Sequence, residues 1–132
     1  RVELFLVNLG MTVLPRLPRF WIRGLAAAAG TTAYYLAPGT RRLALANINL
    51  ALREDCPPRR RPALVRRAFC NMALVMLDFF WFSRDTTARL RRYVQVDPWM
   101  RECLRHGPVI GVTAHFGNWE LLAQAFAMDG VT

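Results

Sequence analysis

The apolar stretch Pro108–Ala114 constrains the fold more than any other part of the chain. It is rich in valine and isoleucine, and a glycine at position 117 follows it closely. An apolar run of this length between turn residues is typical of a buried β-strand. The next segment, Asn118 to Met128, is patterned as a helix and is closed by Gly130. We therefore predict a strand, a tight turn and a helix in this order.

The preceding residues repeat this alternation. Tyr93–Val96 alternates like a brief strand, and Asp97 followed by Pro98 predicts a helix that ends near Arg105. Strand, helix, strand and helix predict an α/β fold with a mostly parallel sheet flanked by helices. Val131 resembles the start of a further strand, so we expect the chain to be a truncated fragment of a longer protein.

An apolar helical region, residues 1–38, leads into this expected α/β domain, residues 39–132. Its most apolar run, Gly24–Ala37, is shorter than the roughly 20 residues that a helix needs to cross a bilayer. Aromatic residues stand at both ends of the run, at positions 20, 21, 34 and 35, as in helices that lie in the headgroup region. We predict an interfacial or re-entrant membrane segment. A buried helical hairpin packed on the expected α/β domain is the alternative.

Two further helices are expected between these regions. The first covers Arg41–Arg53 and has apolar residues on two sides. The second runs from about Arg61 to Phe82, with apolar residues every three or four positions. Asp78 lies among apolar neighbours in this second helix, so we expect it to pair with an arginine.

Composition indicates an anionic partner. The formal net charge is +9, and all 18 basic residues are arginine. Phosphate-bearing lipid, an acidic carrier protein and nucleic acid are the candidates, with a solvated basic surface as the alternative. No nucleic-acid-binding motif accompanies the charge, so that reading is the weakest. His106 and His115 are the only histidines, which argues against a zinc site.

The strongest candidate site is the junction itself. His115 is expected at the carboxyl end of the strand, where open α/β sheets place their ligand sites. Glu120 would lie in the first helical turn, from which it could orient one imidazole nitrogen of His115. Backbone N–H groups at the helix start favour a developing oxyanion. The alternative is an ordinary strand-end histidine beside an unrelated helix-start glutamate.

The string His-Phe-Gly-Asn-Trp-Glu at positions 115–120 resembles the H-x-x-x-x-[DE] block of the bacterial late lipid A acyltransferases, the Kdo-lipid A lauroyl and myristoyl acyltransferases. Arg41-Arg42 with Asn47, and the helix around Asn71, are also similar to that family. The likeness spans nearly all of this chain but only the first part of the family's usual length.

The resemblance implies that His115 is a general base and that Glu120 is its charge partner. It also implies that Gly117, Asn118 and Trp119 shape the site. The family takes its acyl group from acyl carrier protein, or sometimes coenzyme A. It acylates a phosphorylated glucosamine lipid at the cytoplasmic face of the bacterial inner membrane, and no cofactor or metal is implied.

These observations predict transfer of a fatty acyl group from a thioester to a hydroxyl of a lipid A precursor. Within the same chemistry, the acceptor could be a lysophospholipid or a mannosylated phosphoinositide. A non-catalytic adaptor that binds membrane surfaces through its arginines is the alternative from a different class.

Overall fold

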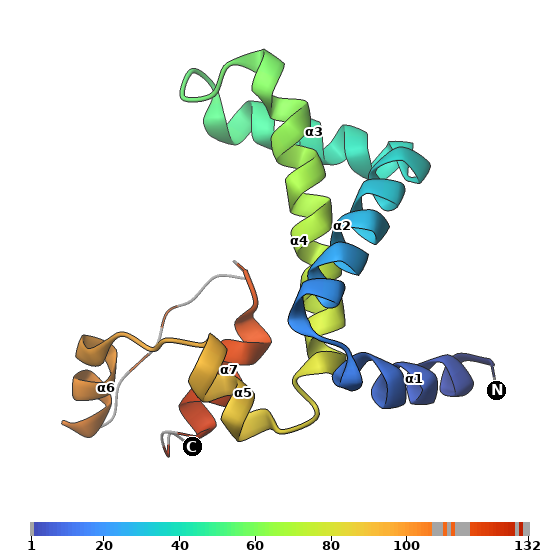
Figure 1. Cartoon of the computed structure of the whole chain (residues 1–132). Coiled ribbons are helices and arrows are strands. Elements are labelled where there is room, and N and C mark those ends of the chain that lie inside the picture. Colours follow the sequence, from blue (N-terminus) through green and yellow to red (C-terminus); the bar gives the residue numbers. More distant parts are fainter. Residues whose placement is uncertain (1, 107–109, 111, 113–116, 129, 131–132) are drawn as a thin grey trace. The chain divides into compact units, whose positions relative to one another are not determined.

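The computed structural model describes residues 2–106, 110, 112, 117–128 and 130. These residues are predominantly helical (Figure 1). The helices are α1 (Val2–Val13), α2 (Arg19–Leu36), α3 (Pro38–Leu52), α4 (Arg61–Trp81), α5 (Thr86–Tyr93), α6 (Pro98–Arg105) and α7 (Trp119–Met128), with short 3-10 turns at Leu14–Arg16 and Pro58–Arg60. The chain divides into two compact units, Arg1–Trp81 and Phe82–Thr132.

The predicted α/β fold with a parallel sheet is wrong, because the described residues contain no β-strand. The expected strand at 93–96 begins inside α5, which the Val94 N–H closes by donating to the Leu90 carbonyl at 2.8 Å. In the expected strand at 108–114, Ile110 and Val112 are 95% and 96% exposed, so they are not buried. The other residues of that stretch, apart from these two, lie outside the described residues. A strand is stable only when a neighbour pairs with its backbone N–H and C=O groups.

Helices α2 and α4 form the core of the first unit, where they pack side by side (Figure 1). The buried residues of α2 recur every fourth position and form one stripe: Ile22, Ala26, Gly30 and Tyr34. A Cβ added at Gly30 would lie 2.4 Å from the Cα of Cys70 in α4, so the two backbones nearly touch there. The small residues of α2 therefore set the close approach of the two helices.

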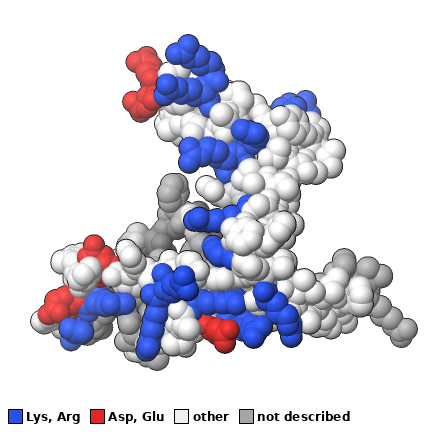
Figure 2. All heavy atoms as spheres, in the orientation of Figure 1, with Lys and Arg blue, Asp and Glu red and all other residues white. Residues whose placement is uncertain are grey.

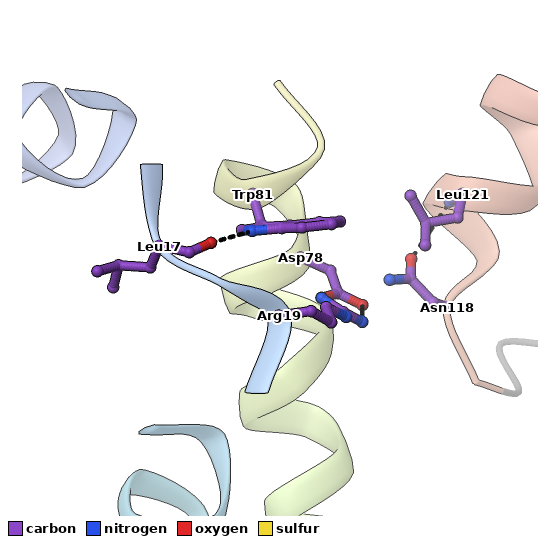
Figure 3. A network of polar contacts seen from close by, with 6 residues as sticks. All are labelled: Leu17, Arg19, Asp78, Trp81, Asn118 and Leu121. Atoms are coloured by element: carbon purple, nitrogen blue, oxygen red, sulfur yellow. Dashed lines mark hydrogen bonds and ion pairs between the residues drawn. The ribbon is translucent and has the colours of Figure 1, made fainter. Parts of the chain in front are cut away.

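An arginine and an aspartate join the start of α2 to the end of α4 (Figure 3). The two terminal guanidinium nitrogens of Arg19, Nη1 and Nη2, donate to the carboxylate of Asp78, with 3.1 Å between Nη2 and Oδ2. The guanidinium carbon also lies 4.9 Å from the ring centre of Trp81. The Trp81 indole N–H donates to the carbonyl of Leu17 at 2.9 Å. Asp78 is 4% exposed, and its expected pairing with an arginine is confirmed.

Helix α1 presents apolar side chains to solvent, including Leu4 and Phe5, which are 69% and 65% exposed. Phe20 and Trp21, at the start of α2, are exposed as well. Among the helices in the described part of the chain, none combines the length and the apolar character that crossing a membrane requires.

In the second unit, α5 packs against α7. Leu90 of α5 and Ala125 of α7 are 2% and 7% exposed and lie in its core. The Asp97 side chain accepts a hydrogen bond from the Trp99 N–H at 2.8 Å and caps α6, which ends at Arg105 as the sequence predicts. This unit carries the described part of the candidate site.

Candidate functional site

The motif at positions 115–120 is described from Gly117 onward. His115 lies outside the described residues, as does the rest of the 113–116 segment. Gly117, Asn118, Trp119 and Glu120 form the turn into α7 and its first residues. The described part of the site therefore consists of the residues that start α7.

Gly117 adopts a left-handed backbone conformation with φ of +70°. A Cβ at this position would meet no heavy atom within 4 Å. The position therefore favours glycine because of its backbone conformation, and not because a neighbour crowds it. The chain turns here directly before α7, where the sequence predicts a tight turn.

Asn118 caps α7. Its side-chain Oδ1 accepts a hydrogen bond from the N–H of Leu121 at 3.2 Å (Figure 3), in the geometry of an N-cap residue. Helix α7 begins at Trp119, one residue after the start that the sequence suggests. The cap holds the first turn in place, and that turn presents N–H groups that favour a negative charge nearby.

Glu120 lies in the first turn of α7, where the helix dipole favours its ionised carboxylate. The residue is exposed, whereas Trp119 beside it is half-buried. The Trp119 indole N–H donates to Oε1 of Glu120 at 3.1 Å. The indole of Trp119 therefore helps to hold the Glu120 carboxylate in one orientation. A carboxylate in this position can orient a basic group. The N–H groups at the start of the helix can polarise a carbonyl.

A groove that the sequence did not reveal lies beside the other end of α7. It has a volume of about 460 Å³, and its lining residues come from α5, α6, α7 and the segment between α5 and α6: Leu90, Arg91, Val94, Val96, Arg101, Arg105, Ala125 and Met128. Sequence reasoning treated these arginines as part of a general basic surface. The only sequence signal was the spacing of Arg101 and Arg105, which places both on one face of a helix.

Metal-binding groups do not gather in the described part of the chain, where no three His, Cys, Asp or Glu side chains are placed to hold an ion. The three cysteines, Cys56, Cys70 and Cys103, are free thiols. The described histidine, His106, shares a hydrogen bond of 2.9 Å between its Nδ1 and the carbonyl of Glu102. These groups offer no second candidate site.

Comparison with known proteins gives one match. No curated protein and no solved structure matches the chain. The family model described as bacterial lipid A biosynthesis acyltransferase matches residues 1–132. Since this match includes the motif at 115–120 together with both helical units, the chain belongs to the bacterial lipid A biosynthesis acyltransferase family.

Proposed function

We propose that the protein transfers a fatty acyl group from a thioester to a hydroxyl group of a lipid A precursor, with His115 as general base and Glu120 as its partner. Membership of the family supports acyl transfer in lipid A biosynthesis. The observation that carries the finer chemistry is the position of Glu120 in the first turn of α7, three residues after the left-handed Gly117. A carboxylate so close to the turn is within the sequence distance at which it can orient the histidine.

In the proposed reaction, one imidazole nitrogen of His115 takes the proton of the acceptor hydroxyl. The oxygen attacks the thioester carbonyl, and a tetrahedral intermediate with a negatively charged oxygen forms. Backbone N–H groups at the start of α7 are suited to stabilise that charge. The intermediate then expels the thiolate, which receives the proton from the imidazolium. Glu120 stabilises the imidazolium through its negative charge, and no covalent acyl-enzyme is required.

The donor in this proposal is acyl carrier protein or acyl-coenzyme A, and the acceptor is a phosphorylated glucosamine lipid at the cytoplasmic face of the bacterial inner membrane. The net charge of +9 supports anionic partners of this kind. The exposed apolar side chains of α1 support contact with lipid. This helix, from Val2 to Val13, carries no arginine.

Alanine substitutions of His115 and Glu120 test the mechanism. We expect His115→Ala to lower kcat for acyl transfer at least about a hundredfold, because general-base catalysis contributes roughly 10²- to 10⁴-fold. Glu120→Ala should also lower kcat, and Glu120→Gln should do so without loss of the Trp119 contact. The measurement is acyl transfer from a thioester to the lipid A precursor, followed by mass spectrometry of the lipid.

His106→Ala is the matched control, because His106 is an exposed histidine outside the motif. It should retain the wild-type rate. Near-normal transfer by His115→Ala would refute the proposed base. If transfer persisted in both motif variants while vesicle binding was unchanged, a non-catalytic role for the motif would replace the proposal.

A further inference from the structure

Three arginines converge on the groove beside α7. Arg91 comes from the last turn of α5, and Arg101 and Arg105 come from one face of α6. An adjoining hollow of about 540 Å³ also has Arg91 and Arg101 in its lining. The guanidinium groups of separate helices therefore border one concave surface, which neither helix could form by itself.

Part of the groove lining is apolar. Leu90 and Ala125 are buried, and they belong to the helices α5 and α7 that pack against each other. Val94 and Val96 are half-buried and line the groove between α5 and α6. Exposed charged groups and less exposed apolar side chains therefore line the same groove, which suits a ligand that has both an anionic and an apolar part.

The described acidic side chains near the groove have contacts of their own. Asp97 is the one acid among those that border either hollow, and its Oδ1 already accepts the Trp99 N–H. Arg105 lies 3.5 Å from Glu102, but both side chains are more than half exposed, so the pair is weak in water. Three arginines that line one concave surface create a positive potential there, which attracts an anion.

We propose that this groove binds a phosphate group of a substrate that also carries an apolar part. Guanidinium groups bind phosphate through paired N–H donors, and three of them can surround one phosphate. The groove reaches Met128 in the last turn of α7, and Glu120 lies about 12 Å away along the same helix at 1.5 Å per residue. Phosphate binding at one end of α7 would thus fix a substrate whose reacting group lies near the other end.

This inference rests on the proposed function for the identity of the ligand. Either substrate can supply the phosphate, because the acceptor is a phosphorylated glucosamine lipid and the alternative donor is a coenzyme A thioester. The shared chemistry is a phosphate group beside an apolar portion. The groove is therefore assigned as a phosphate subsite of the acyl-transfer site.

Equilibrium binding to the protein, measured by titration calorimetry without any acyl transfer, tests the subsite. The ligands are the phosphorylated glucosamine lipid, the same lipid after removal of its phosphate, coenzyme A, and pantetheine, which lacks phosphate. The variants are Arg91→Ala, Arg101→Ala and Arg105→Ala. Each should weaken binding of a phosphorylated ligand roughly tenfold or more, the effect of losing a charge-assisted hydrogen bond. Binding of the phosphate-free ligands should not change.

Arg92→Ala is the matched control, because Arg92 is the next residue of α5, is exposed and does not line the groove. Circular dichroism of each variant verifies its helical content. The variant Arg91→Lys keeps the positive charge but loses the paired N–H donors of the guanidinium group. If the groove variants lose affinity for the phosphorylated lipid alone, the subsite belongs to the acceptor. If they lose affinity for coenzyme A alone, it belongs to the donor.

Equal affinity of the groove variants and Arg92→Ala for both phosphorylated ligands would overturn the inference, as would an equal loss for the phosphate-free ligands. Because no transfer is measured, the outcome is independent of the His115 experiment. An active His115→Ala protein would refute the proposal that His115 is the general base. The phosphate subsite would still be tested by the binding measurements alone.

Discussion

Gly30 shows how a single residue sets the geometry of the first unit. An added Cβ would lie 2.4 Å from the Cα and 2.6 Å from the backbone nitrogen of Cys70. Backbone atoms cannot move aside as the end of a flexible side chain can. Gly30 therefore allows the close packing of α2 on α4, although glycine inside a helix is unfavourable by itself.

We predict that Gly30→Ala destabilises the protein by about 1 to 3 kcal/mol, the usual cost of overpacking a core. Gly24→Ala is the control on the same helix, because its Cβ would meet nothing within 4 Å. That change should be neutral or should stabilise by up to about 1 kcal/mol through helix propensity. Urea unfolding followed by circular dichroism measures both. Equal stability of the two variants would contradict the inferred close contact.

At the scale of elements, the ion pair between Arg19 and Asp78 fixes the start of α2 to the end of α4. The side chains are 18% and 5% exposed, so the charges are largely removed from water. A carboxylate buried in this way depends on its partner, since an unpaired buried charge is costly. The stacking of Arg19 on Trp81 and the indole hydrogen bond to Leu17 hold the same junction.

We predict that Asp78→Ala lowers the free energy of unfolding by about 3 kcal/mol, because it leaves the Arg19 guanidinium without its carboxylate. The double variant Arg19→Met with Asp78→Leu should recover much of this loss, because two apolar side chains remove the desolvation cost. Glu102→Ala is the surface control and should cost at most about 1 kcal/mol. A double variant that is no more stable than Asp78→Ala would contradict the inference that the two charges act as a pair.

The elements also show what the sequence can reveal. The helix expected over about Arg61–Phe82 is observed as Arg61–Trp81, and the predicted helix Pro98–Arg105 has the same bounds in the structure. These predictions succeed because apolar periodicity and caps such as Asp97 are local properties. The strand predictions fail because a short apolar run does not determine its own pairing partner, and Ile110 and Val112 are exposed.

The same limit applies to the site. The string at 115–120 is contiguous, so its resemblance to a family could be recognised without any structure, and the family is confirmed. The arginine groove could not be recognised, because Arg91 and Arg101 belong to different helices and meet only after packing. The predicted roles of His115 and Glu120 stay predictions, with His115 outside the described residues.

For the whole molecule, exposed basic and exposed apolar side chains both contribute to the described surface, and α1 carries apolar ones without any arginine. Basic side chains cover more of the face shown in Figure 2 than acidic ones do. Arg59 and Arg60, which precede α4, are exposed, and α1 presents exposed apolar residues such as Leu4 and Phe5. The proposed contact with a membrane therefore has an electrostatic and a hydrophobic component on separate elements.

We predict that the protein binds vesicles containing anionic phospholipid more tightly than neutral vesicles, and that added salt removes this difference through screening. Arg59→Ala with Arg60→Ala should weaken binding to anionic vesicles only, since each arginine near such a surface contributes about 1 kcal/mol. Leu4→Ser with Phe5→Ser should weaken binding to both kinds of vesicle, because burial of apolar area does not depend on lipid charge. Vesicle co-sedimentation at two salt concentrations separates the two components. Binding that is equal on both vesicles and insensitive to salt would remove the electrostatic component and leave α1 as the proposed contact.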